Sequence, residues 1–84
     1  MAKASGIYTD QHGLEWERWE SASGTSYTAW GPQEEAMRVF PIRAAGKMSD
    51  YAATVNGFIV AMNVDSLTRT MDQVHQAIYA LDRA

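Results

Sequence analysis

Apolar and polar residues alternate with a period of two through the N-terminal part of the chain. Three runs rich in aromatic or β-branched residues, Ile7–Thr9, Leu14–Glu20 and Thr25–Trp30, are separated by polar and glycine-containing clusters at 10–13 and 21–24. Short runs bounded by turn residues in this way are typical of antiparallel strands. The pattern therefore predicts an N-terminal β-meander.

The segment after Trp30 carries signals for two different structures. Gly31-Pro32-Gln33-Glu34-Glu35 is typical of a helix start, because proline suits the first helical position and acids in the first turn interact favourably with the helix dipole. Pro41 limits that helix, since the residue before a proline avoids the helical region. We therefore expect a short middle helix, and a strand over Met37–Ile42 is the alternative.

Asn56-Gly57 is the most specific local signal in the chain. Both residues tolerate positive φ, which favours the type I′ turn of a two-residue β-hairpin. The predicted cross-strand pairs, all on the core face, are Val55 with Phe58, Ala53 with Val60 and Tyr51 with Met62. A helix is the alternative, because several of these apolar residues also fall at helical spacing. Gly57 would cost such a helix about 1 kcal/mol relative to alanine, so the hairpin is preferred.

The C-terminal segment has the most regular pattern. Its apolar stripe, at helical spacing, consists of Leu67, Met71, Val74, Ile78 and Leu81. Asp65 or Ser66 can cap the start of this helix, and Thr70–Gln73 offers a second capping box one turn later. The fold class predicted from all these elements is α+β: a small antiparallel sheet, made of the N-terminal meander and the Asn56-Gly57 hairpin, packed with a short middle helix and a longer C-terminal helix.

Length and composition place these elements in a single domain of 84 residues, 1–84. Such a short domain buries only about 60–65% of its unfolded surface, so its stability margin is thin. The absence of cysteine excludes disulfides and thiolate metal sites, while 46% hydrophobic residues supply a core and leave material for an interface. Met1–Gly6 has no signal-peptide pattern, and the longest apolar run, Phe58–Met62, is far shorter than the ~20 residues of a membrane span. We therefore expect a cytoplasmic protein that is not inserted in a membrane.

Neither histidine belongs to a recognisable catalytic or metal-binding motif. His12 follows Asp10 in a polar turn, which is either an acid/base or hard-metal site or, as we prefer, a solvated turn. His75 lies one helical turn from Asp72 and from Tyr79, an arrangement that could orient a general base and is equally typical of a solvated helix flank. The glycines are scattered singly, and no nucleotide, zinc or calcium motif is present. We expect a protein that is not an enzyme and that has no cofactor or bound metal.

The most distinctive segment is Glu15-Trp16-Glu17-Arg18-Trp19-Glu20. In a strand, Trp16 and Trp19 face opposite ways. If Trp16 enters the core, Trp19 stands on an acidic outer face, where tryptophan is typical of a binding surface. The alternative is that a helix or loop covers Trp19 and makes it a core residue. The expected partner-binding residues are Glu15, Glu17, Trp19, Glu20, Glu34 and Glu35.

These observations favour a non-catalytic protein-binding module, a small inhibitor or adaptor whose acidic, aromatic surface contacts a basic protein partner. In its size and its lack of catalytic parts the chain is similar in type to phage or mobile-element antagonists of host systems, anti-CRISPR proteins among them. No motif of any one such family is present, so no family residue can be carried over. Two alternatives remain: a self-assembling structural protein that dimerises through its C-terminal helix, and a weak nucleic-acid-binding domain using Arg38, Arg43 and Lys47, which the net charge of −3 opposes.

Overall fold

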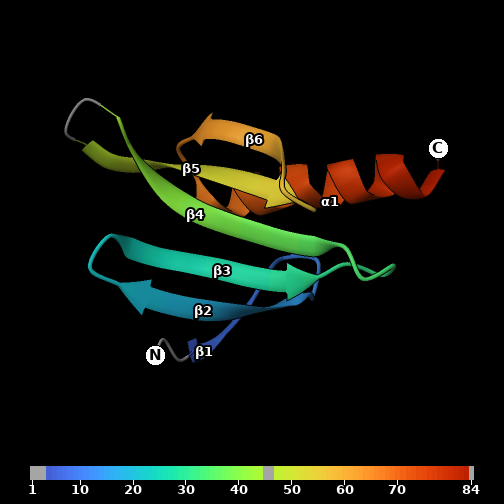
Figure 1. The fold of residues 1–84 in the computed structure, drawn as a ribbon, viewed down its shortest axis with the longest axis horizontal. Helices are drawn as coiled ribbons and strands as arrows, with labels where there is room; N and C mark the ends of the chain where they lie inside the picture. The colour runs from blue at the N-terminus through green and yellow to red at the C-terminus, as the bar shows by residue number, and fades with distance from the viewer. Residues whose placement is uncertain (1–3, 45–46, 84) are drawn as a thin grey trace.

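The computed structural model describes residues 4–44 and 47–83, and for residues 43, 44 and 47–49 it describes the backbone alone. Within these residues, six strands form one antiparallel sheet in chain order, and one helix follows them (Figure 1). The elements are β1 (Ala4–Thr9), β2 (Glu15–Ser21), β3 (Gly24–Trp30), β4 (Ala36–Ala44), β5 (Lys47–Val55), β6 (Phe58–Val64) and α1 (Leu67–Arg83). Each strand pairs with its neighbour in sequence, so short turns suffice to build the sheet.

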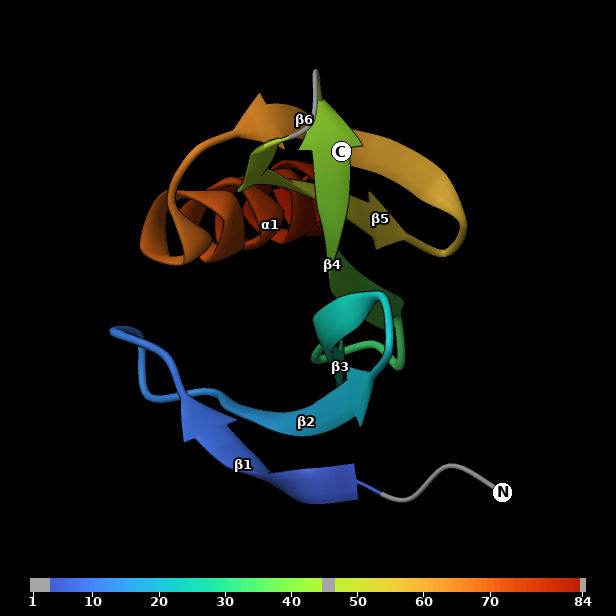
Figure 2. The same cartoon turned by 90° about the vertical axis from the view of Figure 1, so that its left-hand side faces the viewer.

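The sheet is strongly curved, and α1 lies on its concave side (Figure 2). We call this side the inner face and the convex side the outer face. The helix packs on β4, β5 and β6, while the turn between β1 and β2 reaches towards it from the other end of the sheet (Figure 2). The hydrophobic core therefore lies between the inner face and α1.

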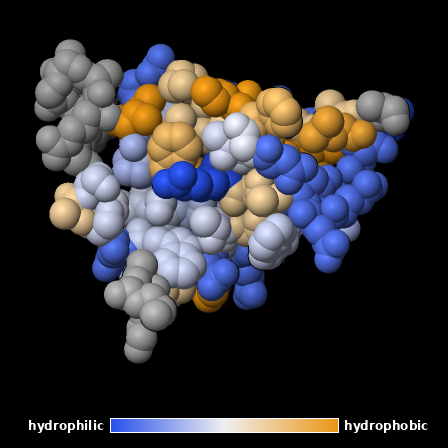
Figure 3. All heavy atoms as spheres, viewed as in Figure 1, coloured by the Kyte–Doolittle hydropathy of each residue, from blue (hydrophilic) through white to orange (hydrophobic). Residues whose placement is uncertain are grey.

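Alternation along the strands decides which side chains enter this core. Trp16 of β2, Val39 of β4 and Val74 of α1 have no exposed surface. The other members of the core are Tyr27, Met37, Ala53, Val55, Ala61, Val64, Met71 and Ile78. The apolar stripe of α1 is thus used on the protein's own sheet, except for Leu81, which is 54% exposed. Further hydrophobic residues gather along the upper edge in Figure 3, the edge at which Figure 1 places β6.

The predicted short middle helix is wrong, because residues 36–44 form strand β4 and the alternative strand over Met37–Ile42 is what the structure shows. Met37 and Val39 are buried on the inner face and Arg38 between them is exposed, so the period of two prevails over the helix-start signal. Pro41 is tolerated in this strand. The pairing of β3 with β4 extends only as far as Val39, so Pro41 has no strand neighbour on that side to require an N–H.

The residues read as a helix start form the loop between β3 and β4 instead. The N–H of Gly31 donates to the carbonyl of Glu35 at 2.8 Å, and the carboxylate of Glu35 accepts the N–H of Gln33 at 2.9 Å. Glu34 adopts a positive φ of 63°. A Cβ atom at Gly31 would lie 2.3 Å from Oε1 of Glu35, so a side chain at this position would displace the Glu35 carboxylate. Glu34 and Glu35, which would suit a first helical turn, therefore belong to a tight loop between two strands.

The Asn56-Gly57 hairpin is present, but its register departs from the prediction. Asn56 and Gly57 have φ values of 51° and 85°, and Val55 pairs with Phe58 as the turn requires. Two register shifts follow along the hairpin. The observed pairs are Thr54 with Ile59, Ala53 with Ala61 and Tyr51 with Val64. The predicted partners Val60 for Ala53 and Met62 for Tyr51 were wrong, because bulges cannot be read from the turn sequence. The predicted core-face position was also wrong for Phe58 and Met62, which are 77% and 49% exposed.

Helix α1 begins at the first of its two predicted caps. The hydroxyl oxygen of Ser66 accepts the N–H of Arg69 at 3.3 Å, as an N-cap does. Thr70 lies inside the helix, where its hydroxyl donates to the carbonyl of Ser66 at 2.7 Å. Among the residues that the structure describes, no helix has the length and apolar character needed to cross a membrane.

Candidate functional site

A row of paired residues crosses the outer face of the whole sheet. Glu17 of β2 pairs with Thr28 of β3, and Thr28 pairs with Arg38 of β4. Arg38 in turn pairs with Thr54 of β5. The row ends on the two edge strands, at Ile7 of β1 and Ile59 of β6. Because directly paired residues are neighbours on one face, an acid and a base stand on either side of a threonine.

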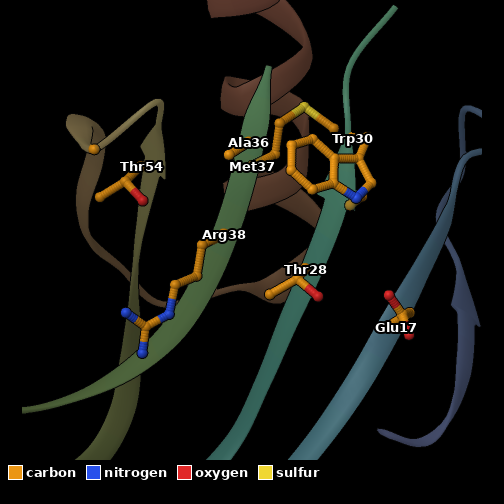
Figure 4. Close-up of a pocket in the computed structure, with 9 residues that line it drawn as sticks. Glu17, Thr28, Trp30, Ala36, Met37, Arg38 and Thr54 are labelled. Carbon is orange, nitrogen blue, oxygen red and sulfur yellow. The ribbon is translucent and has the colours of Figure 1, made fainter. Parts of the chain in front are cut away.

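A groove of about 490 Å³ follows the middle of this row (Figure 4). Trp30 lies at one end of the groove and is 66% exposed. Figure 4 shows Glu17 and Arg38 on opposite sides of Thr28. The guanidinium of Arg38 lies 4.9 Å from the ring centre of Phe40, a cation–π contact. The groove therefore combines the exposed indole ring of Trp30 with two separated charges of opposite sign, those of Glu17 and Arg38.

Trp19 lies on the same outer face as the groove, and its side chain is half-buried. Its indole N–H donates to the hydroxyl oxygen of Thr28 at 2.8 Å. The hydroxyl group of Thr28 keeps its own hydrogen, which remains available to a ligand in the groove. Helix α1 packs on the inner face, so it does not cover Trp19.

The residues of β2 predicted to bind a partner are divided between the two faces of the sheet. Glu15, Glu17 and Trp19 share the outer face, and both glutamates are exposed. Glu20 points the other way, with Arg18, from which it is separated by 3.7 Å in an ion pair. The structure therefore brings together three of these four residues.

The two acids of the β3–β4 loop differ from each other. Glu34 is exposed and lies beside Trp30, with which it lines a shallow hollow. Glu35 is only 7% exposed, and its carboxylate accepts the N–H of Gln33 within the loop. Slight burial, together with the charge of Glu35 and a hydrogen bond to it, raises the pKa of Asp82 at the end of α1.

Trp30 is a groove residue that was not among those predicted to bind a partner, and Arg38 was named only for the alternative of nucleic-acid binding. Alternation through Thr25–Trp30 places Thr28 and Trp30 on one face, so half of the signal is present in the sequence. The other half is the register between β3 and β4, which sets Arg38 beside Thr28. Register follows from the loop that joins the strands, and the sequence of that loop predicts a helix start instead.

A second polar cluster joins the β1–β2 turn to α1. Asp10 lies at its centre, with a side chain only 2% exposed. One carboxylate oxygen accepts the indole N–H of Trp16 at 2.8 Å and lies 2.7 Å from Nε2 of His75. The other oxygen accepts the backbone N–H groups of His12 and Leu14 at 2.9 and 3.0 Å. These four contacts satisfy a buried carboxylate that would otherwise be costly.

His12, the second histidine of this cluster, lies in the β1–β2 turn and pairs with a residue of α1. Nε2 of His12 lies 2.6 Å from Oδ1 of Asp72, to which the amide of Gln11 also donates at 2.7 Å. The rings of His12 and His75 are in contact, with centroids 4.1 Å apart and planes tilted by 33°. His12 of the turn therefore pairs with Asp72 of the helix, and His75 of the helix pairs with Asp10 of the turn. The sequence predicted a solvated turn and a solvated helix flank, and neither description includes these contacts.

The cluster borders a cavity of about 620 Å³ that also includes Gln76 and Tyr79. A carboxylate that holds an imidazole by one nitrogen is the arrangement of an oriented general base. Here both imidazoles contact carboxylates through Nε2, and the contacts close the turn onto the helix. Over the described ranges 4–44 and 47–83, no group of three or more His, Cys, Asp or Glu residues could hold a metal ion.

The hydrogen bonds of this cluster predict that the fold is sensitive to acid. Burial alone would raise the pKa of Asp10, but hydrogen bonds from Trp16, His75 and the backbone outweigh burial and hold that pKa below its ordinary value of 3.8. Hydrogen bonds from His12 and Gln11 likewise lower the pKa of Asp72. A carboxyl group with a lowered folded-state pKa stabilises the fold above its unfolded pKa, and this contribution is lost as the pH falls through the folded value.

We therefore expect the free energy of unfolding to decrease as the pH falls below about 4. Urea unfolding at a series of pH values measures this slope. The slope should be smaller in Asp10→Asn, which removes the carboxyl group whose pKa is lowered. The raised pKa of Asp82 acts in the opposite sense, since protonation of that carboxyl favours the folded state. An Asp10→Asn variant with the full wild-type slope would contradict this assignment.

No protein-family model matches the chain, and neither a curated protein nor a solved structure matches it.

The groove and the cluster differ in how far their polar groups are satisfied. In the cluster, Asp10 is fully hydrogen-bonded and both histidines have carboxylate partners. In the groove, neither Glu17 nor Arg38 forms an ion pair with any residue of the described part. Unpaired charges beside an exposed tryptophan are available to another molecule, whereas the cluster already serves the fold.

Proposed function

We propose that this protein is a non-catalytic binding module that contacts a protein partner through the outer-face groove. The observation that carries the proposal is Trp30, 66% exposed at the end of a groove in which Glu17 and Arg38 have no ion-pair partner among the described residues. Tryptophan and arginine are enriched among residues that contribute most to binding energy. A partner that covers the groove would bury the indole and pair both charges.

The charge of the outer face supports a basic partner. Glu15 and Glu17 stand on the same face of β2, and Glu34 lies beside Trp30. Acidic groups around an aromatic residue attract a basic surface and raise the rate of association. We propose that the partner presents lysine or arginine to Glu17 and an acceptor to Arg38.

An acidic surface of this kind can also occupy a groove that normally binds nucleic acid. The proposal therefore extends to an inhibitor or adaptor of a nucleic-acid-handling complex. Competition between this protein and an oligonucleotide for the captured partner tests the extension, which would be wrong if both bound that partner together with unchanged affinity.

The test of the proposed function compares two aromatic substitutions. Trp30→Ala removes the ring in the groove, and Tyr79→Ala removes a ring of similar exposure, 62%, on α1 beside the Asp–His cavity. The wild-type protein is used to capture partners from a lysate of its source, and the affinity of each variant for the captured protein is then measured by calorimetry. We expect Trp30→Ala to weaken binding at least about 10-fold and Tyr79→Ala to leave it unchanged.

A charge variant adds a kinetic measurement to the same experiment. Glu15→Lys/Glu17→Lys should slow association and reduce its dependence on salt, because it removes the steering charge. Full affinity in Trp30→Ala, or loss of binding in Tyr79→Ala alone, would overturn the proposal and assign binding to the cavity on α1.

A further inference from the structure

The sheet ends at β6, whose free edge is apolar. Within the described residues β6 pairs with β5 alone. The strand contains neither a charged residue nor a proline, two of the features that protect an edge strand from pairing with another chain. Bulges are a third such feature, and the register shifts of the β5–β6 pairing lie beyond Ile59, so Phe58 and Ile59 form the regular part of this edge. Phe58, Ile59 and Met62 are 77%, 62% and 49% exposed. An edge with these properties is a template for a further strand.

A second apolar groove, of about 490 Å³, lies between β6 and the last turns of α1. The large side chains of Phe58 and Leu81 line it and are exposed, while Ala77 and Ala80 leave room between them. The hydrophobic band along the upper edge of Figure 3 lies where Figure 1 places β6. The surface thus combines projecting and recessed apolar groups, as a self-complementary two-fold interface requires.

We propose that a second copy of this chain occupies this surface, so that β6 pairs antiparallel with β6 of the other copy. The apolar surface of this edge comes from four large exposed side chains, Phe58, Ile59, Met62 and Leu81. A specific interface buries about 1,000 Å² or more in total, so these side chains and the strand backbone have to supply about 500 Å² per copy.

Charge also favours a second copy as the occupant. The protein has a net charge of −3, so two copies repel each other wherever their acidic outer faces approach. The β6 strand carries no charge, and it is therefore an edge at which identical chains can meet without a like-charge contact. The small size of the domain gives an additional reason, since short chains commonly gain stability by burying surface in an oligomer.

The opposite edge of the sheet supplies a matched control. Strand β1 is also an edge strand, and its Ile7 is 60% exposed, close to the 62% of Ile59. Ile7 is the only large hydrophobic residue of β1 among the exposed ones in the described part. The two isoleucines stand at the two ends of one cross-sheet row, so they differ in the edge to which they belong.

Sedimentation equilibrium between about 1 µM and 200 µM tests the proposal, because mass action makes a dimer concentration-dependent. We expect the wild type to approach twice the monomer mass with rising concentration. Ile59→Lys should raise the dimer dissociation constant at least about 10-fold, and Leu81→Lys should do the same from the helix side of the groove. Ile7→Lys should dimerise as the wild type does. Circular dichroism establishes that each variant is folded.

A wild-type protein that remains monomeric over this range would overturn the proposal, as would dissociation by Ile7→Lys with no effect of Ile59→Lys. The result is independent of the proposed function, because neither Ile59 nor Leu81 lines the outer-face groove around Trp30. A variant that loses the dimer but keeps partner binding can therefore be distinguished from one that loses partner binding but keeps the dimer.

Discussion

Asp10→Ala should reduce the free energy of unfolding by about 3–5 kcal/mol, the typical cost of removing one partner from a buried, charge-assisted network. The substitution leaves the indole N–H of Trp16, the imidazole of His75 and two backbone N–H groups without their acceptor. Because the site is buried, water does not fully replace the carboxylate. Urea unfolding at neutral pH measures the loss.

The control for this prediction is Asp72→Ala. Asp72 also holds a histidine, His12, but it does so at the surface, where solvent replaces a lost hydrogen bond. We therefore expect a clearly smaller loss of stability than in Asp10→Ala. Equal losses in the two variants would mean that Asp10 is not the centre of the contact between the β1–β2 turn and α1.

Trp16→Ala should destabilise the protein by about 3–5 kcal/mol, because it opens a cavity in the core between the sheet and α1. Trp16 has no exposed surface and also donates to Asp10. Trp16→Phe keeps most of the ring volume but removes this donor, so it should cost about 1–3 kcal/mol. The difference between the two variants, measured by urea unfolding, separates packing from hydrogen bonding.

Trp30→Ala is the matched surface control for the core substitution. Its ring is 66% exposed, so the free energy of unfolding should change by no more than about 0.5 kcal/mol. A small effect of Trp16→Ala, or a large effect of Trp30→Ala, would contradict the division between a core tryptophan and a surface tryptophan. That division allows the groove to be altered without unfolding the protein.

Elements with a strong local pattern could be predicted from the sequence. The N-terminal strands follow from alternation and turn residues, and the C-terminal helix follows from its apolar stripe. The middle of the chain could not be predicted correctly, because Gly31–Glu35 contains the same residue types that start a helix. The Glu35 carboxylate accepts a hydrogen bond from Gln33 in its own loop, and this contact stabilises the connection between β3 and β4 in place of a helix start.

The two sites were partly predictable for the same reason. Alternation along β2 correctly separates the faces of Trp16 and Trp19. The Asp–His pairs, in contrast, join residues 65 and 60 positions apart, so nothing local indicates them. Their formation requires the sheet to curve until the β1–β2 turn meets α1, which is a property of the whole fold (Figure 2).

The most direct test of the central claim, that the outer-face groove is the binding surface, is a footprint of the captured partner by backbone amide chemical shifts. The account predicts that the largest changes fall on Glu17, Thr28, Trp30 and Arg38. Changes centred on Gln76 and Tyr79 of α1, with the β2–β4 outer face unaffected, would contradict it.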